Sequence, residues 1–150
     1  MKTTGIFLAA ALLLVFAGNS SCNKIKKDKG IIGSEIAFPI CFQPENSSNE
    51  WVITSQDDYL LLTNEFLNCS SQGFAAIDFE NYSLLGKYTT AGCNVQFWRQ
   101  VLRNDASKTI EYNILVKTHG LCSKSGYSYN WVIVPKIPED YTVKFNVQRK

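Results

Sequence analysis

The sequence has little of what catalytic and nucleic-acid-binding proteins usually carry. It holds one histidine, His119, and no Gly-rich phosphate loop, no G-x-S-x-G nucleophile motif and no H-E-x-x-H zinc motif. Its five cysteines form no C-x-x-C pair, so the ligand spacing of a structural zinc site is missing. The formal net charge of +2 is too small to indicate a nucleic-acid partner. We therefore expect no catalytic residue, no cofactor, no metal site and no nucleic-acid partner.

The sequence also lacks an apolar run long enough to span a membrane. Ile6–Ala17 holds 12 residues, whereas a helix needs about 20 to cross a bilayer. Lys2 precedes this run and small or polar residues follow it, which is the layout of a secretory signal peptide. We expect residues 1–21 to be that signal peptide.

Two cleavage sites compete at its end. Ser20 and Ser21 directly before Cys22 suit a lipoprotein signal peptidase, which leaves an acylated cysteine at the mature N-terminus. Cleavage after Ala17 by ordinary signal peptidase would give a secreted protein instead. Five cysteines leave one unpaired, and acylation of Cys22 accounts for it. We expect Cys22 to be lipidated, with plain secretion as the alternative.

Residues 22–34 have the composition of a tether. They lack hydrophobic periodicity and contain four lysines between Lys24 and Lys29, with Asp28 as the acid among them. Near an anionic membrane each lysine is worth about 1 kcal/mol of attraction. A single globular domain over residues 35–150 should follow, long enough for a real core.

The periodicity of this domain predicts a mainly β fold, of the α+β kind, with one short helix. Ser55 three residues before Asp58 resembles a capping box, and apolar residues at helical spacing follow, so we expect a helix over residues 56–67. Beyond it, apolar and polar residues alternate with a period of two, which predicts an antiparallel meander or sandwich-like sheet. The clearest alternating stretches are 82–88, 110–117 and 141–147.

A polar turn over residues 104–107 predicts a β-hairpin, and the hairpin allows a disulfide prediction. With the turn centred on Asp105 and Ala106, Cys93 lies opposite about Thr118, close to Cys122. The hairpin geometry therefore makes a Cys93–Cys122 disulfide plausible.

A second disulfide, Cys41–Cys69, then follows by elimination. Four cysteines permit three pairings, and spacing alone leaves the other two open. Each predicted bridge closes a loop of nearly 30 residues and should stabilise the fold by about 3 kcal/mol.

Asp78 and Glu80 are the carboxylates that we consider for catalysis. They flank Phe79, so both side chains should lie on one side of a strand. Paired carboxylates serve glycosidases, which makes a carbohydrate-directed enzyme our alternative hypothesis. The pair would need to share a concave pocket.

Aromatic residues make up 13% of the chain, and they either fill the core or form an exposed platform for a peptide or glycan. Trp98 is the best platform candidate, because it lies opposite the face shared by Val95, Phe97 and Val101. The turn at Gly92 and the loop 120–126 should meet at one end of the hairpin, where loops on a rigid scaffold commonly bind partners. Our candidate binding residues are Trp98, Gly92, Lys124 and Tyr127.

One stretch of the domain resembles a family pattern. Ile77-Asp78-Phe79 opens it, Thr89-Thr90-Ala91-Gly92 precedes two long hairpin strands, and Trp131–Pro138 closes it. The pattern is similar to uncharacterised lipoproteins of the Bacteroidetes and, more distantly, to the C-terminal domain of the protease-complex subunit PrcB family. The resemblance implies a small β domain that binds a protein partner without doing chemistry, as in a protease-associated or inhibitor-like domain.

These observations lead to one functional expectation. We expect a binding or interaction module without catalytic activity, held to the bacterial cell envelope by lipid and able to contact an envelope protein. Surface-exported lipoproteins of the Bacteroidetes often resemble one another in an acidic run after the cysteine, whereas this tether is basic. We therefore expect the anchor to lie in the outer membrane and face the periplasm.

Overall fold

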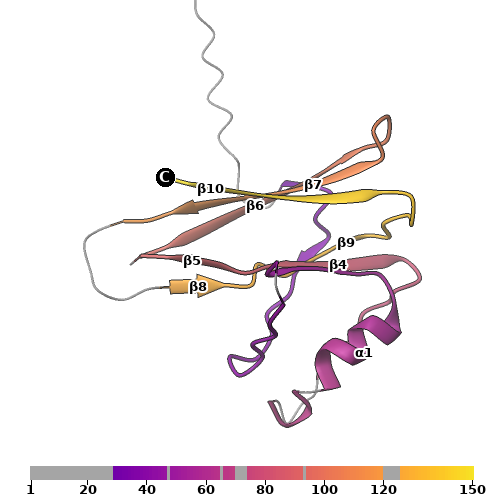
Figure 1. The fold of residues 1–150 in the computed structure, drawn as a ribbon, viewed down its shortest axis with the longest axis horizontal. Helices are drawn as coiled ribbons and strands as arrows, with labels where there is room; N and C mark the ends of the chain where they lie inside the picture. The colour runs from indigo at the N-terminus through magenta and orange to yellow at the C-terminus, as the bar shows by residue number, and fades with distance from the viewer. Residues whose placement is uncertain (1–28, 47, 65, 70–73, 93, 120–125) are drawn as a thin grey trace, which may run out of the picture.

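The computed structural model describes residues 29–46, 48–64, 66–69, 74–92, 94–119 and 126–150. In this part of the chain the fold is mainly β with one α-helix, as the periodicity predicts (Figure 1). The elements in chain order are β1 (Lys29–Gly30), β2 (Ser34–Glu35), β3 (Glu50–Ile53), α1 (Gln56–Asn64), the 3₁₀ turn η1 (Leu67–Cys69), β4 (Tyr82–Lys87), β5 (Thr89–Ala91), β6 (Gln96–Asn104), β7 (Thr109–Lys117), β8 (Gly126–Ser128), β9 (Val132–Pro135) and β10 (Thr142–Arg149).

The strands form two four-stranded sheets and a two-stranded ribbon. The first sheet has the order β1-β6-β7-β10, the second β2-β9-β4-β3, and β5 pairs with β8 in the ribbon. All pairs in the second sheet and the ribbon are antiparallel, and so is the β6–β7 hairpin. β1 and β10 pair in parallel with β6 and β7, a direction that residue alternation does not reveal.

The two sheets and the helix form three layers, with a hydrophobic core in each gap (Figure 1). The core between the sheets, here called the aliphatic core, consists of Leu85, Val101, Ile110, Tyr112, Ile114, Val116, Val132, Val134 and Ile137. The core between the second sheet and the helix side, here called the aromatic core, consists of Phe42, Trp51, Ile53, Tyr59, Ile77, Phe79, Leu84 and Trp131. β4 lies in the middle layer, so Leu84 and Leu85 point to different cores and both are fully buried.

The helix begins as the capping box predicts and ends earlier than expected. The Asp58 backbone N–H donates to Ser55 Oγ at 3.1 Å, and the Ser55 hydroxyl donates back to the Asp58 carboxylate at 2.7 Å. The α-helix stops at Asn64, because Phe66 N–H bonds to the carbonyl three residues back and the chain tightens into η1. This turn brings Cys69 to Cys41, and the predicted Cys41–Cys69 disulfide is present.

The hairpin is present, but its register differs from the expected one. Asn104 pairs with Thr109, whereas a turn centred on Asp105 and Ala106 would place Asn104 opposite Ser107. The observed turn is longer because Lys108 adopts a positive φ of 48° and the Asn104 side chain accepts from Ser107 N–H at 3.1 Å. Cys93 and Cys122 lie outside the described residues, so their pairing stays a prediction.

The expected tether overlaps the fold. β1 and the first residue of β2 fall within residues 22–34, and they pair with β6 of one sheet and β9 of the other. The chain can approach β6 this closely because Gly30 lacks a side chain: an added Cβ would lie 1.7 Å from Val101 O, and its φ is +88°. The N-terminal segment therefore joins the edges of both sheets before the rest of the domain begins.

Candidate functional site

A hollow of about 270 Å³ lies between the segment after β2 and the segment that joins β8 to β9. We call it the aromatic slot. Its lining includes five aromatic residues, Phe38, Phe42, Tyr127, Tyr129 and Trp131, and four polar ones, Glu35, Arg99, Ser128 and Asn130. Aromatic walls with a few convergent polar groups are the usual composition of a ligand site.

The slot arises where β2 stops following its neighbour. Ile36 N–H still donates to Trp131 O, and beyond it the chain turns away at Pro39, whose carbonyl accepts from Phe42 N–H. Proline cannot donate in a ladder and suits the end of an edge strand. The space beside β8 that a longer β2 would fill is therefore left as the slot.

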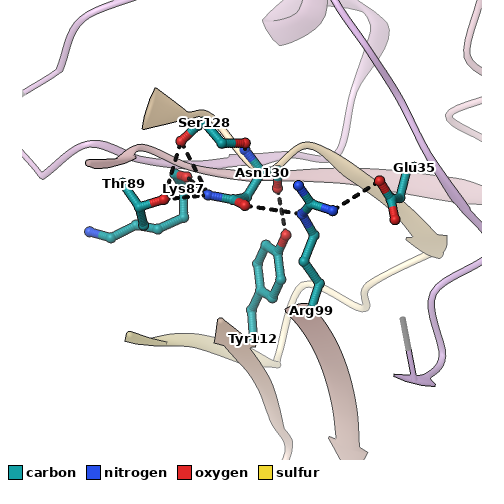
Figure 2. A network of polar contacts seen from close by, with 7 residues as sticks. All are labelled: Glu35, Lys87, Thr89, Arg99, Tyr112, Ser128 and Asn130. Carbon is teal, nitrogen blue, oxygen red and sulfur yellow. Dashed lines mark hydrogen bonds and ion pairs between the residues drawn. The ribbon is translucent and has the colours of Figure 1, made fainter. Parts of the chain in front are cut away.

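A polar network forms one side of the slot, centred on Asn130 (Figure 2). Its side-chain N–H₂ donates to Thr89 Oγ1 at 2.7 Å, to Lys87 O at 2.9 Å and to Ser128 O at 3.1 Å. Its side-chain oxygen accepts from Arg99 Nε at 3.0 Å. The Asn130 side chain is 2% exposed, so each of these bonds replaces one to water.

Asn130 also has an unusual backbone. Its φ is 46°, in the left-handed region that asparagine tolerates better than most residues. Its N–H donates to Ser128 Oγ, and its carbonyl accepts from the Tyr112 hydroxyl, which rises from the aliphatic core. The residue thus joins the slot to the packed centre of the sandwich.

The charged side chain of Arg99 points into the domain, where it contacts Glu35 (Figure 2). It lies on β6 at an inward position, between Phe97 and Val101 in the period-two pattern. Arg99 Nη1 lies 2.9 Å from Glu35 Oε2; the two side chains are 12% and 43% exposed. The pair places a cation and an anion side by side at the slot, so their charges cancel locally.

The aromatic wall continues as a row of neighbouring rings. Tyr129 lies parallel to Trp131 with centroids 6.4 Å apart, and it contacts Tyr127 edge-on at 6.3 Å. Burial raises the pKa of the Tyr129 phenol, and the neighbouring Tyr88 and Tyr127 add to the shift. The indole N–H of Trp131 is buried and has no hydrogen-bond partner among the residues that the structure describes.

The candidate binding residues separate in the structure. Tyr127 lines the slot and is 48% exposed, whereas Trp98 lies on the opposite face of its strand from Arg99, with Lys117 Nζ 5.6 Å from its ring centroid. Gly92 follows β5 and lies next to Gly126; a Cβ added at Gly92 would meet no atom of the described residues within 4 Å. Lys124 lies outside the described residues, as does the lipidation candidate Cys22.

Asp78 and Glu80 border a different hollow, an open one of about 470 Å³ beside Lys136. Both are exposed, and the Asp78 carboxylate is engaged in a turn, where it accepts from Glu80 N–H at 3.0 Å and from the Asn81 side chain at 2.8 Å. The bonds from Asn81 and Glu80 lower the pKa of Asp78. A general acid needs a raised pKa, whereas the pKa of Asp78 is lowered. The contacts of Asp78 therefore suit a turn-forming role better than that of a general acid.

Tyr127 is the slot residue that was among the sequence candidates, whereas the polar residues Glu35, Arg99, Ser128 and Asn130 were not. Arg99 could have been found, because the period-two stripe of Phe97 and Val101 places it on the inward face, where a charge requires a partner. No local signal marks Glu35, which lies 64 residues from Arg99 in the chain. Asn130 is marked weakly, as a turn-forming residue between two aromatic ones.

Comparisons with known proteins add no further information on the site. No family model, no curated protein and no solved structure matches the chain. Within the described ranges, no group of three or more His, Cys, Asp or Glu side chains is placed to hold a metal ion. No helix in that same part of the chain is long and apolar enough to cross a membrane.

Proposed function

We propose that the protein is a non-catalytic binding module of the bacterial cell envelope, anchored by lipid at Cys22, that takes its ligand in the aromatic slot. The observation that carries this proposal is the slot itself: aromatic walls beside a buried polar network. Ligand sites commonly combine apolar walls with a few fixed polar groups. The resemblance to lipoproteins and to PrcB-type domains agrees with a binding role.

Hydrogen bonds and a disulfide hold the residues that support the slot, which favours binding. Asn130 holds Lys87, Thr89, Ser128 and Arg99 through one side chain. The Cys41–Cys69 disulfide closes the segment that begins at the slot wall. A site whose side chains are already ordered loses less entropy when a ligand arrives, so affinity improves without new contacts.

The anchor would keep the slot close to the membrane. β1 begins at Lys29, seven residues after Cys22, and an extended chain of that length reaches about 25 Å at most. Ligands presented at the envelope surface, including the envelope protein that the resemblance suggests, are therefore the accessible ones. We place the anchor in the outer membrane, facing the periplasm.

Site-specific photocrosslinking in the native envelope tests the binding role. A benzophenone amino acid placed at Tyr127 reacts with C–H bonds of any neighbour, so it reports protein and glycan ligands alike. The matched control is the same probe at Tyr82, which is 41% exposed and lies outside the slot. We expect adducts from position 127 and none from position 82. No adduct from position 127, or equal adducts from both, would contradict the proposal.

Metabolic labelling with an alkyne fatty acid tests the anchor. We expect the label on the wild-type protein and no label on Cys22→Ser, because acylation requires the thiol of that residue. An unlabelled wild type, or a label that survives the substitution, would remove the lipid anchor and leave the secreted form.

A further inference from the structure

We infer that the ligand of the aromatic slot is a neutral sugar ring, so that the protein binds a glycan end. This inference rests on the proposed binding function and adds the chemical class of the ligand. It follows from three properties of the slot: its size, its aromatic walls and the cancelling charges of Glu35 and Arg99.

The size of the slot suits one ring or one side chain. Its volume is about 270 Å³, whereas pockets for drug-sized molecules span roughly 300–1,000 Å³. One face of a pyranose ring carries mainly C–H groups. Such a face packs well on an aromatic ring, and Tyr127, half exposed at the rim, offers one beside Tyr129.

The charges favour a neutral ligand with hydroxyl groups. An anion drawn to Arg99 would meet the Glu35 carboxylate 2.9 Å away, and a cation drawn to Glu35 would meet Arg99. A hydroxyl group both donates and accepts, so neighbouring hydroxyls can accept from the guanidinium and donate to the carboxylate. Hydrogen bonds to charged groups are also stronger than those between neutral ones.

A purely apolar ligand fits the slot less well. An aliphatic or aromatic side chain would remove water from the Arg99–Glu35 pair without replacing its hydrogen bonds, and that desolvation is costly. A ligand with hydroxyl groups can replace hydrogen bonds that the pair loses to water, whereas a hydrocarbon group cannot.

Titration of the full-length protein with simple glycosides tests the inference. The protein is extracted in a detergent without a sugar headgroup, and saturation-transfer NMR is recorded with the methyl glycosides of glucose, galactose and N-acetylglucosamine. We expect at least one to bind, with a Kd on the order of millimolar, as suits a ligand this small. Tyr127→Ala should weaken binding about tenfold by removing the stacking surface, and Tyr82→Ala should leave it unchanged.

Glu35→Gln tests the charge argument with little change in shape. The substitution removes the Glu35 carboxylate that Arg99 contacts, so the charge of the slot rises by one unit. We expect glucuronate, which the wild type should bind more weakly than methyl glucoside, to gain about tenfold relative to it. A thermal melt of each variant shows that the fold is retained. An unchanged ratio would show that the ion pair does not select the ligand and would overturn the charge argument.

The same titration includes N-acetyltyrosinamide as a peptide-like probe. If this amide binds with Tyr127-dependent affinity and none of the glycosides does, the sugar class is wrong while the binding function stands. Glycoside binding that survives Tyr127→Ala lies elsewhere and also overturns the inference. The binding function itself fails if the photocrosslinker at position 127 captures nothing in the envelope, or captures no more than the one at position 82.

Discussion

The two cores of this protein are built from different kinds of residue, and they differ in their relation to the slot. The aliphatic core lies between two regular sheets, and Tyr112 is the one ring among its nine buried residues. The aromatic core has five rings among eight buried residues, and it lies under a helix, irregular segments and a disulfide. The slot opens beside the aromatic core. Trp131 belongs to that core and also lines the slot.

The difference has a physical origin. Branched aliphatic side chains on paired strands interdigitate densely, because the strand spacing repeats along the whole sheet. Large flat rings held by loops meet at varied angles; around Phe38 the interplanar angles run from 38° to 83°. Such packing leaves ring faces uncovered at its border, and a ligand can use them. The aliphatic core therefore supplies the scaffold and the aromatic core supplies the site.

The largest expected effect comes from emptying the aromatic core. Phe42→Ala removes a ring that is 2% exposed and touches the rings of Phe38, Phe66, Phe74 and Trp131, so we expect a loss of about 4 kcal/mol in unfolding free energy. Urea denaturation measures it. Phe42→Leu, which keeps most of the volume, should cost less than half as much.

The matched change in the aliphatic core is Ile114→Ala, which should cost about 3 kcal/mol. If the cores divide the work as argued, Phe42→Ala should also weaken ligand binding in the slot, and Ile114→Ala should not at temperatures where the variant is folded. Equal losses of binding in the two variants would contradict the division.

The next effect concerns the Cys41–Cys69 disulfide, which lies beside the aromatic core. Replacing both Cys41 and Cys69 by alanine opens a loop across 28 residues and should cost about 3 kcal/mol. Amide hydrogen exchange locates the loss: faster exchange is expected in α1 and its flanks, and little change in β7. Uniform acceleration across both sheets would show that the bridge stabilises the whole domain instead.

Local patterns predicted the parts of the fold that local physics decides. The capping box at Ser55 set the start of the helix, and alternation placed Ile110, Tyr112, Ile114 and Val116 on one buried face. Strand direction was beyond reach, because alternation looks the same in parallel and antiparallel pairs. The parallel contacts of β1 and β10 therefore came only from the structure.

The slot was out of reach for a further reason: its polar residues are far apart in the chain. Glu35 meets Arg99 across 64 residues, and Asn130 meets Lys87 across 43. Their meeting depends on which strands pair and in what register, and the four-residue turn shows how easily a register prediction slips. The sequence indicates Tyr127 as a binding residue, but it does not indicate the polar residues beside it.

Substitution of Asn130, at the border between the two cores, should have a smaller effect on stability. Asn130→Gly keeps the left-handed backbone but loses the side-chain bonds to Thr89, Lys87 and Arg99, so we expect a cost of about 2 kcal/mol. Asn130→Ala should cost about 1 kcal/mol more, because alanine disfavours φ of 46°. Chemical denaturation of the two variants measures the gap. Equal stability would mean that the backbone at this residue relaxes.

The smallest effect is a pH dependence that arises from Tyr59 in the aromatic core. Burial raises the pKa of Tyr59 from 10.0 to about 12, and its hydroxyl donates to Ala75 O at 2.8 Å. The unfolded phenol loses its proton near pH 10, before the folded one does. The stability that this phenol contributes is therefore fully present below pH 10 and is lost as the pH rises through about 12.

Tyr59→Phe isolates this contribution. At pH 8 the variant should be about 1 kcal/mol less stable than the wild type, because it lacks the hydrogen bond to Ala75. Phenylalanine cannot ionise, so urea denaturation at intervals from pH 8 to 12 should show this gap closing above pH 10. A gap that stays constant over that range would mean that the Tyr59 phenol titrates alike in the folded and unfolded chains. The pH dependence of stability would then arise from groups other than the Tyr59 phenol.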